Sequence, residues 1–208
     1  MLFRSLRGAD LRDADLRGAD LRDADLHDAY LHDADLRGAD LRDADLHDAY
    51  LRAADLRGAY LRAADLRGAD LHDADLRVAY LRAADLRGAY LRDADLRGAD
   101  LRDADLRDAD LRDADLRAAD LSAANLSGAN LSDSALRDAA GIFSLGNPGN
   151  WYSYAWLRDE ILSIRIGCRE FRYSQALAYW QPMADRNEQL ASVEYAKQVA
   201  LSRGWKIE

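Results

Sequence analysis

The chain is dominated by a five-residue pattern of apolar and polar positions. Leu occupies every fifth position from Leu6 to Leu136, and Ala stands two residues before each Leu from Ala9 to Ala129. This period fits neither an α-helix, which repeats every 3.6 residues, nor a strand, which repeats every two. It fits a chain that turns a corner every five residues. We expect Leu and Ala to point inward, the other three positions to face water, and stacked coils to satisfy one another's backbone groups.

The pattern stops at Gly141, and the composition changes there. The Gly- and Pro-rich segment 146–150 predicts a turn or linker. Alternating aromatic and small residues predict a strand over 151–156, and residues 161–168 predict a second short strand. Residues 174–180 and 186–205 predict helices. The apolar positions near helical spacing in the second helix are Leu190, Val193, Ala196, Val199 and Leu201.

The A(D/N)LXX pattern over residues 4–138 resembles the pentapeptide-repeat family. This resemblance implies an all-β solenoid, a right-handed quadrilateral β-helix with four repeats in each coil. The 27 repeats then give a rod about 32 Å long at the ~4.8 Å spacing of paired strands. Residues 141–208 resemble C-terminal elements of phage and bacterial members. We therefore expect two domains, a β-helix over 1–140 and a small α+β element over 141–208, which caps the open coil edges and is a candidate homodimer interface.

Composition narrows the class of protein. The 208 residues carry a formal net charge of -9, and Cys168 is the single cysteine. The acidic balance argues against direct nucleic-acid binding, which needs net positive charge. The first residues predict no secretory signal, and no apolar run approaches the roughly 18 residues of a membrane helix. We expect a soluble cytoplasmic protein that does not bind membranes.

Charge is uneven around the predicted coil. With four repeats per coil, the outward positions total -4 on the face of Leu6, -5 on the face of Leu11, 0 on the face of Leu16 and -2 on the remaining face. The acidity thus lies on two adjacent faces. The candidate partner-binding carboxylates are Asp13, Asp25, Asp28, Asp33, Asp45, Asp48, Asp70 and Asp73. The alternative to a partner-binding surface is a surface that is only solvated, in which Arg offsets the repulsion between stacked carboxylates.

Five Tyr replace Asp immediately before Leu, and aromatic residues are enriched in contact sites. They are Tyr30, Tyr50, Tyr60, Tyr80 and Tyr90. They are candidate contact residues, or ladders that only stabilise the stack. The four His replace Arg at an exposed position, which argues against a metal site, and Cys168 has no nearby His to act as a base. Because the sequence shows no enclosed acid–base site, we expect that the protein is not an enzyme and binds no cofactor.

Some members of the pentapeptide-repeat family mimic DNA and bind type II topoisomerases. Resemblance to them implies a protein partner, such as DNA gyrase or another DNA-handling enzyme, whose basic groove takes the acidic rod. B-DNA carries one charge per ~1.7 Å, or about 19 over 32 Å, whereas residues 1–140 net -10. The alternative is a scaffold module whose C-terminal residues mediate recognition or oligomerisation.

Overall fold

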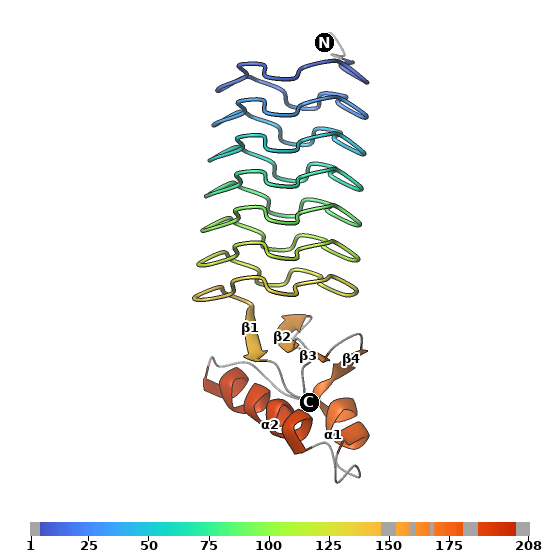
Figure 1. Ribbon diagram of the computed structural model, residues 1–208, viewed down its shortest axis with the longest axis vertical. Coiled ribbons are helices and arrows are strands. Elements are labelled where there is room, and N and C mark those ends of the chain that lie inside the picture. Colours follow the sequence, from blue (N-terminus) through green and yellow to red (C-terminus); the bar gives the residue numbers. More distant parts are fainter. Residues whose placement is uncertain (1–4, 147–152, 159–160, 167–168, 181–186, 203–208) are drawn as a thin grey trace. The chain divides into compact units, whose positions relative to one another are not determined.

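A computed structural model of the chain describes residues 5–146, 153–158, 161–166, 169–180 and 187–202 (Figure 1). The chain divides into two compact units, Met1–Ala140 and Gly141–Glu208. None of the helices in the described residues is long and apolar enough to cross a membrane.

The first unit is a stack of coils, and each coil contains four repeats (Figure 1). Isolated parallel β-bridges join the residue before each Leu to its counterpart four repeats later, from Ser5↔Asp25 to Asp120↔Ala140. The Leu26 amide donates to the Asp45 carbonyl at 2.7 Å, and the Tyr30 amide donates to the Ala9 carbonyl at 2.9 Å. The register does not slip within the described coils, as the repeat predicts.

Each coil has four faces and four corners. We number the faces by the first Leu that each contains, so that Leu6 lies on the first face, Leu11 on the second, Leu16 on the third and Leu21 on the fourth. Every described corner is a turn in which the amide three residues after Leu donates to the Leu carbonyl, at 2.9 Å for Ala9 and Leu6; the donor is Ala in all of them but one, where it is Ser134. The corner residue, two positions after Leu, has a positive φ, such as 55° at Asp13. Asp and Gly are common there because they tolerate the left-handed region better than most residues.

The interior of the coils is built from the two apolar positions of the repeat. Leu26, Ala29 and Leu31 are completely buried, whereas Leu6 and Leu11 in the first coil are half-buried. Ala is required beside Leu because each side chain added to a densely packed interior must displace another.

The expectation that the other three positions face water is wrong for the Arg-paired Asp before Leu in the inner coils. The Asp35 side chain is only 28% exposed, whereas Asp15 of the first coil, which is paired with Arg in the same way, is 60% exposed. Arg37 lies against Asp35 with an Nη2–Oδ2 distance of 2.5 Å, and the preceding coil covers it further, since Arg17 Nε lies 3.7 Å from Asp35 Oδ2. The open positions of the inner coils therefore include the corners and the five Tyr before Leu.

The second unit contains an antiparallel sheet in the order β1-β2-β3-β4 and two helices. The strands are β1 (Ile142–Gly146), β2 (Ser153–Arg158), β3 (Ile161–Ile166) and β4 (Arg169–Arg172). Strands β2 and β3 agree with the two predicted segments apart from their ends. Strands β1 and β4 were not predicted, because each is a short run beside a Gly-containing segment and shows little alternation.

Helix α1 (Tyr173–Trp180) and helix α2 (Asn187–Ser202) lie close to the predicted ranges. They pack on β3 around a buried cluster that includes Ile164, Ala176 and Val193. The prediction that Leu201 shares the apolar face of α2 is wrong: Leu201 is 51% exposed, and Ala200 is buried in its place. Ala200 follows Val193 by two helical turns, which returns it to the same face of the helix.

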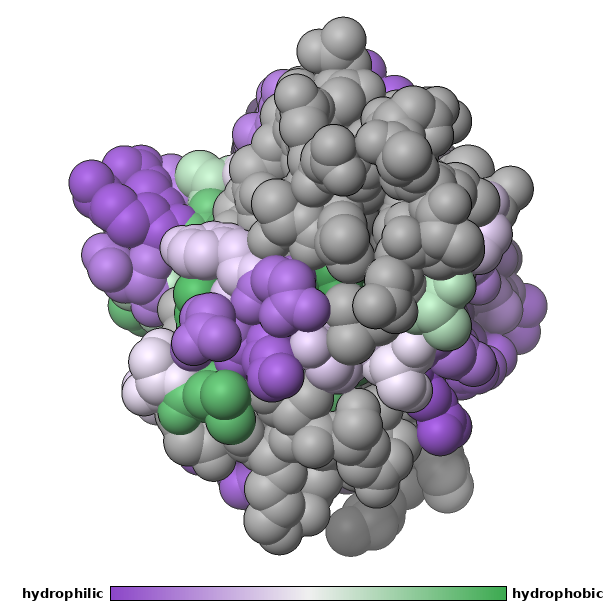
Figure 2. Space-filling model, turned by 90° about the horizontal axis from the view of Figure 1, so that it is seen from below, coloured by the Kyte–Doolittle hydropathy of each residue, from purple (hydrophilic) through white to green (hydrophobic). Residues whose placement is uncertain are grey.

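The face of the molecule in Figure 2 is mainly hydrophilic among its coloured residues, with small separate hydrophobic areas. Some of the predicted features lie outside the described residues. They are the turn over 147–150, the first two residues of the predicted strand (151–152), Cys168 and the ends of the predicted second helix.

We predict that Leu66→Ala, in the middle of the stack, lowers the free energy of unfolding by about 2–5 kcal/mol, because Leu66 is 1% exposed and its truncation leaves a cavity. Urea unfolding followed by circular dichroism measures the loss. Leu11→Ala removes the same atoms from a half-buried site and should cost clearly less. Equal losses for the two variants would contradict this account of the core.

Candidate protein-interaction surfaces

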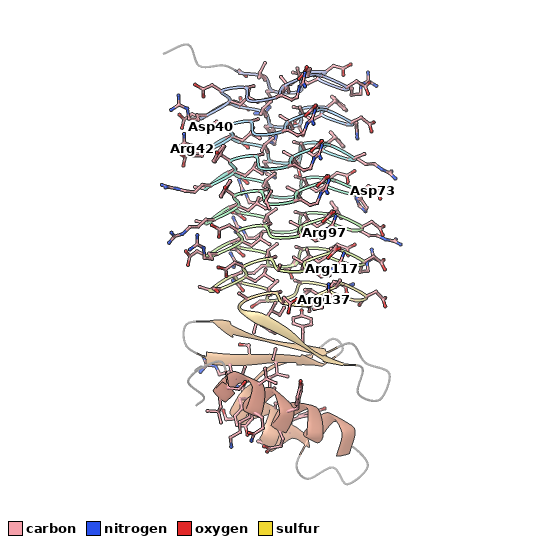
Figure 3. All side chains as sticks on the ribbon, turned by 90° about the vertical axis from the view of Figure 1, so that its left-hand side faces the viewer. Asp40, Arg42, Asp73, Arg97, Arg117 and Arg137 are labelled. Atoms are coloured by element: carbon pink, nitrogen blue, oxygen red, sulfur yellow. The ribbon has the colours of Figure 1, made fainter. Side chains whose placement is uncertain are left out.

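Most carboxylates before Leu are held by an Arg of their own repeat. The Arg42 side chain donates from Nε to Asp40 Oδ1 at 2.8 Å and from Nη2 to Oδ2 at 2.5 Å, and Figure 3 shows the two residues side by side. Fourteen repeats in the described coils contain this pair. The geometry arises because residues two apart across Leu project from the same side of the chain.

Many of these Arg also reach a carboxylate on the same face of the next coil. Arg57 Nε lies 3.5 Å from Asp75 Oδ2, and nine such pairs occur in the described coils. Figure 3 shows Arg97, Arg117 and Arg137 as a column in successive coils of the third face. Alternating acid and base along these columns makes the third face electrically neutral.

These hydrogen bonds stabilise the charged form of the carboxylates. Donation from the Arg12 side chain lowers the pKa of Asp10 to about 2, and donation from Arg17 does the same for Asp15. Burial raises the pKa of Asp55, but hydrogen bonds from the Arg57 side chain and backbone outweigh it, so the net pKa is lowered. Asp10, Asp15 and Asp55 therefore stay ionised at neutral pH, and their Arg partners neutralise them locally.

Three predicted site residues before Leu lack this partner because His replaces Arg in their repeats. Asp25 accepts a hydrogen bond from the backbone amide of His27 at 3.3 Å. Asp45 accepts the equivalent bond from His47 at 3.0 Å. Asp70 lies 2.6 Å from His72 Nδ1. No Arg pairs with these three carboxylates in the part of the chain that the structure describes.

The other five predicted carboxylates lie at corners, with positive φ. Asp28 and Asp48 each lie 3.2 Å from the Nε2 of the preceding His, and Asp73 lies 3.4 Å from Arg52 Nη2. Asp13 and Asp33 form no ion pair with any described residue. Corner side chains project away from the coil, so these charges reach farther than the paired ones.

The first three coils bring six of the eight predicted carboxylates together, whereas Asp70 and Asp73 lie in the fourth coil, after Tyr50. Sequence reasoning missed two further residues, Asp23 and Asp43, which are exposed corner residues between the fourth and first faces. Summing charge by face assigned them to the fourth face, although a corner borders two faces. We define the acidic N-terminal surface as the carboxylates of the first three coils that no described Arg pairs. They are Asp13, Asp23, Asp25, Asp28, Asp33, Asp43, Asp45 and Asp48.

The five Tyr lie on the second and fourth faces, as the repeat register predicts. Tyr30 and Tyr50 stack with ring centroids 5.0 Å apart and an interplanar angle of 5°. Tyr60 and Tyr80 form a second pair with the same values. Tyr90 stacks on His72 at 6.0 Å. These rings stabilise the stack, yet all five remain exposed.

The His side chains make ring contacts with one another and with the Tyr of the second face. His27 and His47 rings meet edge to face at 4.9 Å, and His32 lies 5.8 Å from the Tyr50 ring. Among the described residues, no three His, Cys, Asp or Glu side chains gather in a way that could hold a metal ion. The arrangement offers charge and aromatic surface to a partner.

A family model described as "Pentapeptide repeats" matches the chain in eight copies, over residues 5–43, 44–77, 79–113 and 114–140. The chain belongs to the pentapeptide-repeat family. This match indicates a repeat fold and no enzymatic family. A comparison with curated proteins finds no match.

Several solved pentapeptide-repeat proteins resemble the chain. Rfr23 from the cyanobacterium Cyanothece 51142 is 31% identical, with a TM-score of 0.39 over 49% of this chain and 63% of its own. HetL from Nostoc sp. strain PCC 7120, involved in heterocyst differentiation regulation, is 35% identical, with a TM-score of 0.29 over 66% of this chain and 83% of its own. QnrB1, a plasmid-mediated fluoroquinolone resistance protein, is 22% identical, with a TM-score of 0.28 over 65% of this chain and 78% of its own.

We predict that stability falls in acid because of the Asp–Arg pairs. A carboxylate with a lowered folded pKa stabilises the fold above its ordinary pKa, near 3.8, and loses that contribution as pH falls toward its folded pKa, about 2 for Asp10 and Asp15. The thermal midpoint should therefore be nearly constant from about pH 7 to 5 and should fall between about pH 4 and 2.

The variant Arg97→Gln tests the origin of this loss, because Arg97 pairs with Asp95 and lies 3.6 Å from Asp115 in the next coil. It should be less stable than the unmodified chain at neutral pH, and the difference should narrow as the pH approaches 2. A difference that does not change with pH would show that Arg97 acts through packing alone.

Proposed function

We propose that the chain is a non-enzymatic binding protein whose acidic N-terminal surface occupies the basic DNA-binding groove of a DNA-handling enzyme. DNA gyrase is the first candidate, since some members of the family bind type II topoisomerases as DNA mimics. The proposal places the protein and its partner in the cytoplasm.

The observation that carries this proposal is the distribution of the carboxylates that no described Arg pairs. Arg neutralises most carboxylates elsewhere in the rod, but eight in the first three coils have no described Arg partner. Three coils span about 14 Å at the spacing of paired strands, and duplex DNA carries about eight charges over that length. The eight carboxylates match this number, but Arg7, Arg52 and Arg62 in the same three coils reduce the net charge to -5, about 60% of the charge of DNA over that length, against about half for the whole rod.

The position of these carboxylates also supports a rigid mimic. Six of the eight are corner residues with φ values of 54–59°, namely Asp13, Asp23, Asp28, Asp33, Asp43 and Asp48. Their backbone is fixed by the inter-coil hydrogen bonds, such as that from the Asp28 amide to the His47 carbonyl at 3.1 Å. Preorganised charges lose little entropy when they meet a basic groove.

Replacement of Asp25, Asp28, Asp33, Asp45 and Asp48 with Asn tests the proposal. Exposed ion pairs contribute roughly 0.2–1 kcal/mol each, so five together should change the affinity for gyrase by about tenfold or more. Asn tolerates the left-handed corner conformation, so the fold should be retained. Surface plasmon resonance with purified gyrase measures the dissociation constant, and competition with duplex DNA locates the binding site.

A matched control removes five carboxylates from later coils, Asp93, Asp103, Asp108, Asp113 and Asp110, with the same change in net charge. This control should bind gyrase nearly as the unmodified chain does, and the affinity of the unmodified chain should fall steeply between low and moderate salt. Equal loss in both variants would show that only net charge matters. Binding that is insensitive to salt and to all these replacements would refute the DNA-mimic mechanism for this partner.

The second candidate function is a scaffold module in which residues 141–208 mediate recognition or homodimerisation. It is favoured by two apolar side chains of α2 that are open to solvent, Tyr195 at 55% and Leu201 at 51% exposed. The double variant Tyr195→Ser, Leu201→Ser should convert a dimer to a monomer in sedimentation equilibrium. A protein that is monomeric without these changes would leave this form of the scaffold hypothesis without support.

A further inference from the structure

A second surface, on the fourth face, has a different character from the acidic N-terminal surface. We define the Tyr–Arg patch as Tyr60, Arg62, Val78, Tyr80 and Arg82. Where Tyr replaces Asp before Leu, the Arg that follows Leu loses the carboxylate that fourteen other repeats supply. The two repeats of the patch on the fourth face therefore carry net positive charge on an acidic rod.

Arg62 lacks a carboxylate at each of the four positions with which other Arg of the described coils form ion pairs. Within the coils, Arg pairs with the residue before Leu in its own repeat, as Arg42 with Asp40, or in the stacked repeat of the next coil, as Arg22 with Asp40. Other Arg pair with a corner residue, of the next coil for Arg52 and Asp73 or of the same repeat for Arg92 and Asp93. The corresponding positions for Arg62 are Tyr60, Tyr80, Ala83 and Ala63. Arg62 is exposed and forms no ion pair with any described residue, so its guanidinium is free to bind an external anion.

The Tyr pair supplies an aromatic wall beside this cation. The Tyr60 and Tyr80 rings are nearly parallel at 5.0 Å and are 45% and 47% exposed. Residues two apart across Leu share a side of the chain, as the Asp40–Arg42 pair demonstrates. By the same geometry Arg62 lies on the side of Tyr60, and Arg82 lies on the side of Tyr80.

Val78 is an independent sign of an external partner. It is the corner residue two positions before Tyr80, its φ is 52°, and its side chain is 57% exposed. A β-branched residue in the left-handed region is a conformational outlier, and its backbone is strained. Neighbouring coils place Gly58 and Gly98 in this column, and a Cβ at Gly98 would lie 3.3 Å from Val78 Cγ1. Val78 thus adds an exposed apolar group at a position where Gly would relieve the strain.

We propose that the Tyr–Arg patch docks a segment of a partner protein that carries a carboxylate beside an aromatic or aliphatic side chain. The planar guanidinium of Arg62 binds the carboxylate by bidentate hydrogen bonds. Val78 and the two Tyr rings pack against the apolar group. A phosphate would fit the same fork, but the acidic coils repel the other phosphates of a nucleic acid. This surface lies on a different face from most of the acidic N-terminal surface and binds the opposite charge, so it is independent of the function proposed above.

The test uses the full chain and a fluorescein-labelled octapeptide that carries a single Glu beside a single Phe among Gly and Ser residues, and fluorescence anisotropy measures its binding. The unmodified chain should bind this peptide and should bind neither the matching Lys–Phe peptide nor an oligothymidylate of the same length. Arg62→Gln should weaken binding about tenfold or more, because a charge-assisted hydrogen-bonded pair is lost. Its thermal midpoint should not change, since Arg62 has no ionic partner in the described fold. Arg42→Gln, one coil earlier on the same face, is the control and should retain the affinity.

The variant Val78→Gly distinguishes an effect on docking from an effect on stability, because it should change peptide affinity and thermal midpoint in opposite directions. Removal of the strained side chain should raise the thermal midpoint and weaken peptide binding. Unchanged binding by Arg62→Gln or by Val78→Gly would overturn the proposal. Absence of peptide binding by the unmodified chain, or tighter binding of the oligothymidylate, would also overturn it.

Discussion

The hydrogen bonds between coils determine every other property of the rod. The Leu amide of each repeat donates to a carbonyl of the next coil, as from Leu26 to Asp45, and these bonds hold consecutive coils in a register of four repeats. Once this register is fixed, the neighbours of any surface side chain are known without further information. They are the nearby members of its own repeat and the members of the repeat stacked beside it in the next coil. The neutral third face, the Tyr stacks and the unpaired carboxylates all follow from which residues occupy these positions.

The charge that the surface of this rod offers to a partner therefore depends more on which Asp and Arg are paired than on how many there are. A formal count assigns charge to faces, but fourteen Asp–Arg pairs cancel most of it within single repeats. What remains is set by substitutions at one position of the repeat. Among the residues that the structure describes, His in place of Arg leaves Asp25 and Asp45 without an Arg partner, and Tyr in place of Asp leaves Arg62 without a carboxylate partner. The same structural rule thus produces an acidic surface near one end of the rod and a cationic aromatic patch near its middle.

The repeat period, the inward positions of Leu and Ala, and the stacking of Tyr30 on Tyr50 could be predicted from the sequence, since they depend only on a strict period. The pairing of Asp40 with Arg42 could not, because it depends on which side of the chain the two side chains leave. The low exposure of Asp35 was missed because it depends on cover from the neighbouring coil, and Asp23 and Asp43 were missed because a sum of charge by face ignores that a corner borders two faces. In the C-terminal unit, strands β1 and β4 and the exposure of Leu201 depend on tertiary packing, which short apolar runs do not specify.

The strict five-residue period also constrains how such a surface evolves. Gain or loss of one repeat leaves the Leu and Ala interior intact, but it rotates all later residues by one face, so that an insertion between Tyr60 and Tyr80 would separate the two rings. Gain or loss of a whole coil moves a surface along the axis and leaves its columns aligned. The fold thus tolerates length changes in steps of one repeat, whereas a binding surface that spans several coils survives them only in steps of four. Duplications in this lineage that preserve function should therefore be multiples of a full coil.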